Sequence, residues 1–375
     1  MKKAIINGLL YDGTKSEVKE GATIVWEDGI ITHVSEDTAP PADAEVIDAK
    51  GRFVTPGLID SFSMTGLKEY GIRWEGDDSN EASGTVQPHL SVVDGINPFD
   101  KTFEVARKYG ITTSHVAPGP QAVIGGKTAI VKTAGSVADE MVVKRDHGLA
   151  VSFGEVPKGA YRDKHKVPLT RMRIAYLLRE QLRKATYDKK SEAYQNELLQ
   201  KVLRKEAPVY IRAHRADDIK TALRIQEEFD IDVVLVHGTE AYKLLDELAN
   251  RKTKVIAGPF YNPKSRDELK NLHPSTTKKI ADAQIPYTLT ANAVRNVSLE
   301  GALSIREGVS CTNALHTLTL GAAEILGIEK TVGSIEVGKE ADLIIWDGQP
   351  LELQTNVEQT IIDGSTVYER KGDSQ

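Results

Sequence analysis

The feature that most constrains this chain is the alternation, between residues 56 and 334, of short apolar runs with charged stretches of helical spacing. Such alternation predicts a parallel sheet whose strands are joined by helices. The apolar runs are Gly57–Phe62, Ile111–Val116, Thr128–Lys132, Leu149–Phe153, Val209–His214, Asp232–His237, Val255–Gly258 and Pro286–Thr290. Eight strands suit a closed barrel, so we predict an α/β fold with a (β/α)8 TIM barrel.

Helical periodicity is clearest in four of the segments between these runs. They are Asp217–Phe229, Glu240–Asn250, Leu299–Arg306 and Asn313–Leu326. The basic stretch from Arg171 to Lys205 also has apolar residues at helical spacing. It predicts two amphipathic helices with a solvated charged face, rather than an anion-binding surface.

Both ends of the chain are rich in predicted strands. Thr23–Glu27 and Ile30–Val34 flank Asp28-Gly29, a pair that suits a two-residue hairpin turn. Near the other end, Asp363-Gly364 stands between two further short strands. Neither end alone has enough strands for a stable domain. We therefore predict that residues 1–55 and 335–375 form one composite β-sandwich domain beside a barrel domain of residues 56–334.

Composition narrows the classes of function. The 375 residues carry 48 basic and 54 acidic side chains, and this net charge of -6 argues against a nucleic-acid partner. No apolar run reaches membrane-spanning length and no signal-peptide pattern opens the chain, so we expect a cytoplasmic protein without a membrane partner. The single cysteine, Cys311, excludes an internal disulfide and a cysteine-based metal cluster. We also expect a homo-oligomer.

Two motifs and the divided β-rich ends together resemble the amidohydrolase superfamily, in particular its imidazolonepropionase-like and prolidase-like branch. The first motif is VTPGLID at residues 54–60, and the second is GSIEVGKEADLI at residues 333–344. The resemblance covers essentially the whole chain. It implies a (β/α)8 barrel with a small sandwich, and one or two divalent ions at the strand ends that activate water against amide or cyclic amide bonds.

The resemblance also implies where the metal ligands would lie, and several of those positions are replaced here. The family's His-x-His pair after the first strand is matched by Ser61 and Ser63, whose hydroxyls are poor zinc ligands. The histidine expected at the fifth strand is matched by Arg212, whose fixed positive charge should repel a cation. The aspartate of the eighth strand, both ligand and proton shuttle, is matched by Ala291. We therefore expect no metal cofactor.

A few candidate site residues remain. Glu155 follows the fourth strand and His237 ends the sixth, while His214 comes two residues after Arg212. If a divalent ion such as zinc binds at all, these three are its predicted ligands. The other seven histidines show no paired spacing. Trp74, in an acidic loop after the first strand, is with His214 and Asn292 a candidate for ligand binding.

Arg212 has a further predicted role. A carboxylate at the floor of a low-dielectric barrel mouth has to be neutralised or paired. We therefore predict that Arg212 stands in for the missing metal and forms an ion pair with Glu155.

Three functions stay open at this stage. The first is an amidohydrolase-like protein that has lost metal-dependent hydrolysis and keeps a barrel-mouth pocket for a small molecule or a partner. The second is an active metal-dependent hydrolase of amide or cyclic amide C–N bonds, on dipeptides or imidazolonepropionate-like substrates, with a non-standard ligand set. The third is a structural subunit beside an active relative. The replaced ligands favour the first, but whether the chain is an enzyme stays open.

Overall fold

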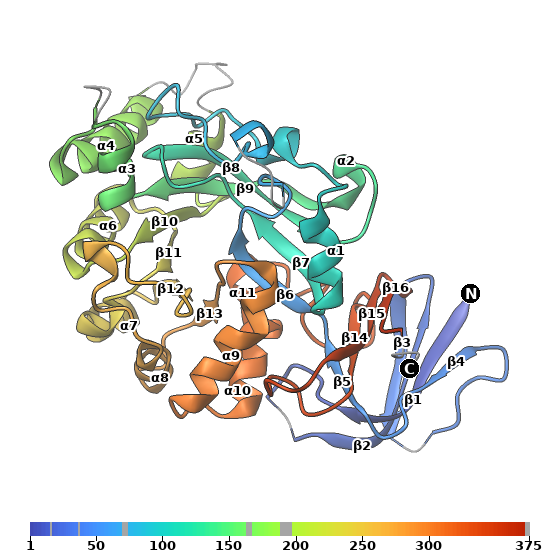
Figure 1. The fold of residues 1–375 in the computed structure, drawn as a ribbon. Helices are drawn as coiled ribbons and strands as arrows, with labels where there is room; N and C mark the ends of the chain where they lie inside the picture. The colour runs from blue at the N-terminus through green and yellow to red at the C-terminus, as the bar shows by residue number, and fades with distance from the viewer. Residues whose placement is uncertain (16, 37, 70–73, 163–166, 188–196, 372–375) are drawn as a thin grey trace.

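The computed structural model describes the chain except for residues 16, 37, 70–73, 163–166, 188–196 and 372–375. Two sheets of eight strands organise it (Figure 1). One sheet is built from the two ends of the chain, and the other from the middle. Within the described residues, no helix is long and apolar enough to cross a membrane.

The terminal sheet joins both ends of the chain. Its strands are β1 (Lys2–Leu10), β2 (Lys19–Glu27), β3 (Ile30–Glu36), β4 (Glu45–Asp48), β5 (Phe53–Pro56), β14 (Leu343–Trp346), β15 (Val357–Ile362) and β16 (Ser365–Glu369). Their order is β16-β15-β14-β5-β1-β2-β3, and β4 pairs with β1. Figure 1 shows the blue N-terminal strands beside the red C-terminal ones. The predicted pairing of the two ends is therefore confirmed.

The hairpin between β2 and β3 forms as predicted. Asp28 and Gly29 both have positive φ, 50° and 84°, as a type I′ turn requires. The ends are joined by the antiparallel pairing of β5 with β14. The hydrogen bonds make one continuous sheet rather than defining two layers, so the sandwich and the domain boundaries at residues 55 and 335 stay predictions.

The second sheet is a nearly closed barrel. Its strands, in spatial and chain order, are β6 (Leu58–Ser63), β7 (Ile111–Val116), β8 (Ile124–Lys132), β9 (Val142–Ser152), β10 (Val209–Ala213), β11 (Val233–His237), β12 (Lys254–Ala257) and β13 (Tyr287–Leu289). The eight predicted runs therefore contribute one strand each. The mixed α/β barrel is confirmed in this coarser form.

The regular (β/α)8 pattern is wrong at one strand. β8 runs antiparallel to both β7 and β9, while the other neighbouring pairs of the barrel are parallel. The reason is connection length. Residues 117–123 join β7 to β8 and residues 133–141 join β8 to β9. A parallel crossover needs about a dozen residues or more, so these connections allow only hairpins.

The gap between β13 and β6 is closed by side chains rather than by a backbone ladder. The Ser61 and Thr288 hydroxyl oxygens lie 2.7 Å apart, and Thr290 Oγ1 donates to the carbonyl oxygen of Phe62 at 2.7 Å. Helices α10 (Cys311–Leu318) and α11 (Leu320–Leu326) pack against both edge strands. The barrel is therefore sealed on the side where its sheet is open.

The remaining helices surround the barrel. They are α1 (Lys101–Lys108), α2 (Ala138–Met141), α3 (Glu155–Ala160), α4 (Arg171–Tyr187), α5 (Glu197–Leu203), α6 (Ala216–Phe229), α7 (Leu245–Asn250), α8 (Ser275–Asp282) and α9 (Val297–Arg306), with short 3-10 turns η1 (Trp74–Gly76), η2 (Val92–Gly95), η3 (Ala241–Lys243), η4 (Asp267–Leu269) and η5 (Val294–Asn296).

The helix predictions are confirmed in part. The basic stretch forms α4 and α5, with residues 188–196 between them outside the described residues. The single helix predicted over Asn313–Leu326 is wrong, because the backbone at Thr319 (φ -127°, ψ -104°) separates α10 from α11. Likewise, the segment Glu240–Asn250 divides into η3 and α7 at Leu244.

Candidate functional site at the barrel mouth

The predicted site residues lie at one end of the barrel, where the parallel strands end. Ser63 ends β6 and His237 ends β11, while Glu155 follows β9 and His214 follows β10. Carboxyl ends of barrel strands form the active face in this class of fold. These four residues therefore share the carboxyl end of the barrel strands, but their contacts differ from those predicted.

Arg212 is buried at this end without an acidic partner. Its side chain leaves the residue only 6% exposed. Nη1 donates to the Ser152 hydroxyl at 3.3 Å and Nη2 donates to the carbonyl oxygen of Pro118, while the guanidinium carbon lies 4.5 Å from the ring centre of Phe62. Among the described residues no carboxylate forms an ion pair with it. The predicted Arg212–Glu155 pair is therefore wrong.

Glu155 is instead held beside another carboxylate, that of Glu268 in η4. The Glu155 amide donates to Glu268 Oε2 at 2.8 Å, and the Glu268 amide donates to Glu155 Oε2 at 3.4 Å. Gly154 makes this approach possible, because it has a φ of 91° and a Cβ there would lie 2.5 Å from Glu268 Oε2. Glu155 therefore contacts the buried Glu268 rather than Arg212.

Glu268 was not identified from the sequence. It is 3% exposed, and burial raises the pKa of its carboxyl. Its Oε1 lies 3.2 Å from Arg266 Nη1 and 3.9 Å from His214 Nε2. The available signal was its position in the loop after the seventh strand, since strand-to-helix loops build the active face of barrels.

His214 and His237 stack on each other. Their ring centres are 4.7 Å apart and their planes differ by 5°. His214 Nδ1 lies 2.8 Å from Thr239 Oγ1, and His237 Nδ1 lies 2.8 Å from the carbonyl oxygen of Gly258. Burial, followed by the charge of Arg212, lowers the pKa of His237 to about 3, and burial holds the pKa of His214 well below its ordinary value. Both imidazoles are therefore neutral at pH 7.

The donor set does not fit a divalent ion shared by both histidines. Imidazole lone pairs lie in the ring plane, and a zinc ion sits about 2.0–2.1 Å from each nitrogen. In-plane lone pairs of two nearly parallel stacked rings do not converge on one point. Within the described residues, no three potential ligand atoms of Glu155, His214, His237 and their neighbours come within ligand distance of one another. Arg212 adds a positive charge beside them.

On β6, the residue that meets Arg212 is Phe62 rather than either of the two predicted site residues, Ser61 and Ser63. Ser61 directs its hydroxyl to Thr288 across the barrel gap, and Ser63 Oγ bonds to Thr65 Oγ1 at 3.0 Å. Phe62, between them, presents its ring to Arg212. The pairing of β6 with β7 is irregular between Asp60 and Ser63, and this irregularity defeats an expectation based on strict alternation.

A cluster of aromatic and histidine rings lies next to Arg212. The Phe62 ring lies 5.3 Å from the ring of His115 and 5.7 Å from that of Tyr210, and His147 Nε2 lies 2.8 Å from the Tyr210 hydroxyl. Burial lowers the pKa of His115 to about 3. Asp60 is 1% exposed with one oxygen unpartnered, and burial raises its pKa to about 7. None of these residues was selected from the sequence.

The other predicted residues form no hydrogen bond, ion pair or ring contact with this group within the described part of the chain. Trp74 is 85% exposed in η1. Asn292 Nδ2 donates to the carbonyl oxygen of Tyr261, and its Oδ1 accepts from Asn296. Ala291 packs against the outer hydrophobic core. Trp74 and Asn292 stay predictions as ligand-binding residues.

One acidic cluster does reach metal-ligand spacing, but it lies elsewhere. Glu340, Asp342 and Asp363 bring their oxygens within 4.8 Å of one another. The Nζ of Lys132, on β8, lies 2.6, 2.8 and 3.1 Å from these three carboxylates respectively. The ammonium group thus occupies the position that a cation would take, and it joins the barrel to the terminal sheet.

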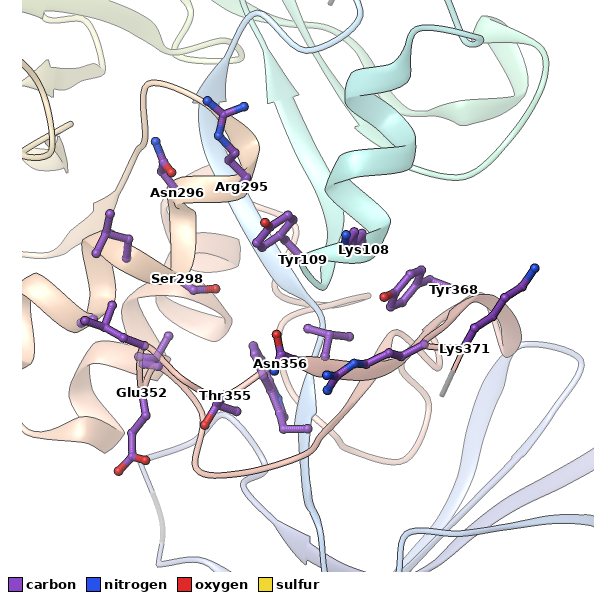
Figure 2. A pocket seen from close by; sticks show the side chains of 17 residues that line it. Lys108, Tyr109, Arg295, Asn296, Ser298, Glu352, Thr355, Asn356, Tyr368 and Lys371 are labelled. Atoms are coloured by element: carbon purple, nitrogen blue, oxygen red, sulfur yellow. The ribbon is translucent and has the colours of Figure 1, made fainter. Parts of the chain in front are cut away.

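Two pockets help to define the surface. One, of about 980 Å³, lies outside Glu155 and is lined by the cations Lys158, Arg162, Arg171 and Arg215 against the anions Glu155 and Asp267. Figure 2 shows another, of about 570 Å³, between the end of α1, the start of α9 and strands β14 to β16. Its labelled side chains include Lys108, Tyr109 and Tyr368, and it contains none of the predicted site residues.

Sequence comparisons identify proteins that are similar to this chain. A model of the amidohydrolase family matches residues 173–368. The amidohydrolase tasK of Hapsidospora irregularis is 27% identical over 97% of this chain, which spans only 43% of that protein's length. The imidazolonepropionase of Shewanella putrefaciens is 23% identical over 87% of this chain and 86% of its own.

Structural comparisons agree. An amidohydrolase from Thermotoga maritima MSB8 has 35% identity and a TM-score of 0.94, with 98% of this chain and 100% of that chain covered. A Xaa-Pro dipeptidase with bound methionine has 19% identity and a TM-score of 0.59, with 99% and 100% covered. The second likeness concerns the fold alone.

Proposed function

Since the chain belongs to the amidohydrolase family, we propose that it keeps the family's barrel mouth as a binding site for a small molecule but has lost metal-dependent hydrolysis. The observation that supports this most is Arg212, a buried cation without an acidic partner beside the strand ends where a metal ion would have to bind. A dication next to a fixed guanidinium is repelled, and the repulsion is strong where water is excluded.

The chemistry of the neighbouring groups also supports a binding role. A hydrolytic metal centre needs several converging ligands and an open position for water. Here Ser61 is engaged with Thr288, and the two stacked imidazoles do not converge. What the mouth offers instead is a positive charge, neutral imidazole nitrogens and a pair of carboxyl groups.

The direct test is an activity assay with and without added metal. Hydrolysis of glycyl-proline and of N-acetyl-alanine is measured on the whole protein with no metal, with zinc and with manganese. The expected result is no turnover above the buffer rate and no stimulation by either ion. Metal-stimulated turnover that disappears in His237→Ala would overturn the proposal.

A second candidate function rests on a specific observation. His237 Nδ1 faces a carbonyl oxygen, which can only accept, so Nδ1 carries the proton and Nε2 keeps its lone pair. Metal-binding histidines are commonly oriented by such a backbone contact. An active hydrolase that uses Glu155, His214 and His237 as ligands is therefore the alternative; it requires the two imidazoles to rotate out of their stack. The same assay separates it from the first candidate.

A further inference from the structure

Arg212 has unused hydrogen-bond capacity although the residue is only 6% exposed. A guanidinium group has five N–H donors, and within the described residues Arg212 donates only to Ser152 and Pro118. Its Nε makes no hydrogen bond within the described residues. The atom nevertheless keeps a small contact with solvent. The Nε–H donor of this almost fully buried guanidinium group is therefore left without a partner in the described part of the chain.

The surroundings of Arg212 do not balance its charge. The two groups that accept from it, the Ser152 hydroxyl and the Pro118 carbonyl, are neutral. Within the described residues Glu155 and Glu268 form no ion pair with Arg212, and each accepts a hydrogen bond from the other's amide. A buried, unpaired charge is costly, so the site has a strong electrostatic preference for an anion.

The geometry points to the chemical class of that anion. We propose, on the basis of the proposed function above, that the barrel mouth binds a small monocarboxylate that carries a hydroxyl or N–H group beside the carboxylate. The planar guanidinium fork matches a carboxylate, and one positive charge balances a monoanion rather than a phosphate dianion. His237, from the neighbouring strand, offers its Nε2 as an acceptor for the adjacent hydroxyl or N–H.

The pocket outside Glu155 is consistent with an anionic ligand. Four of its lining residues are cationic and two are anionic. Arg171 and Arg215 are paired with Asp218 and Asp217, but no ion pair within the described part of the chain involves Lys158 or Arg162. A basic surface at the same end of the barrel raises the local concentration of anions.

The experiment uses lactate as the probe, with two relatives that each lack one feature. Propionate lacks the hydroxyl group, and lactamide lacks the charge. Binding of each to chelator-treated protein is measured by calorimetry in a buffer without carboxylates. Lactate should bind at least tenfold more tightly than lactamide and more tightly than propionate. Equal binding of lactate and lactamide would overturn the anion site, and equal binding of lactate and propionate would overturn the role of His237.

Variants locate the site. Arg212→Gln should weaken lactate binding at least tenfold, and Arg212→Lys, which keeps the charge but loses the fork, should weaken it less. The matched control is Arg204→Gln, because Arg204 precedes β10 at the opposite end of the strand and pairs with Glu206 on the surface. Lactate binding unaffected by Arg212→Gln in folded protein would overturn the inference. The proposed function would be overturned by a different result, metal-stimulated hydrolysis. Failure of this inference can therefore be distinguished from failure of the proposed function.

Discussion

At the scale of single residues, the barrel mouth is defined by ionisable groups that are buried without the partners expected of them. Arg212 has only neutral acceptors, and Asp60 keeps one carboxyl oxygen unpartnered. Each therefore costs free energy of folding in its charged form. Natural proteins retain such costs mainly at functional sites.

The cost at Arg212 gives a first prediction. Because no carboxylate would be left unpaired, replacing the charge with an apolar chain of similar length should not cost the roughly 3–5 kcal/mol of a broken buried ion pair. We expect Arg212→Met to change the free energy of unfolding by less than about 1 kcal/mol, or to increase it. Urea denaturation in a buffer free of carboxylates measures this. A loss of several kcal/mol, relieved by Glu155→Gln, would instead restore the ion-pair hypothesis.

The buried carboxyl group of Asp60 gives a prediction about how folding stability depends on pH. Burial raises its pKa to about 7 in the folded state, from 3.8. The folded protein thus binds more protons than the unfolded chain between these values, so stability falls as the pH rises from about 4 to about 7. The loss is up to about 4 kcal/mol. Asp60→Asn should remove this part of the pH dependence, as measured by denaturation at pH 5 and pH 8. An unchanged difference between the two pH values would contradict the assignment.

The sequence predicted which residues lie at the mouth but not how their side chains are directed. Arg212 was placed correctly at the end of its strand, since period and motif locate strand ends well. Its partners come from Pro118 and Ser152, on other strands and loops, and no local pattern encodes such contacts. The position of Phe62 was missed because irregular pairing breaks the alternation of β6.

At the scale of elements, the positions of the strands could be predicted from the sequence. The direction of β8 was not predicted correctly. The eight runs of the barrel, the β2–β3 hairpin and the two basic helices all follow from hydrophobic period and turn residues. The reversed direction of β8 was within reach, because its short connections exclude a crossover. The break between α10 and α11 at Thr319 could not be predicted, because one apolar periodicity continues through both helices.

The attachment of β8 to the terminal sheet gives a third prediction. Lys132→Met removes the ammonium group from among three carboxylates and leaves their charges uncompensated. Breaking a buried ion cluster in this way should cost about 3–5 kcal/mol. The matched control is Lys205→Met, whose exposed pair with Asp230 is screened by solvent, so its loss should destabilise the protein far less. Equal effects of the two variants on denaturant unfolding would refute the attachment.

At the scale of the whole molecule, the amidohydrolase resemblance seen in two motifs is confirmed by the family match and by the similarity to the Thermotoga maritima structure. The motifs lie at structural joints: the first runs through β5 into β6, and the second leads into β14. Such motifs report the fold. The function depends on residues at the strand ends, which vary independently of the scaffold.

The central claim, that the barrel mouth binds its ligand without a resident metal, is tested most directly by elemental analysis. The whole protein is purified without chelator from cells supplied with zinc, manganese and iron, and metal per chain is measured beside an Arg212→His variant. We predict far less than one metal ion per chain in the unaltered protein, because of the charge of Arg212 and the non-converging imidazoles. One tightly held ion per chain, lost in His237→Ala, would contradict the claim.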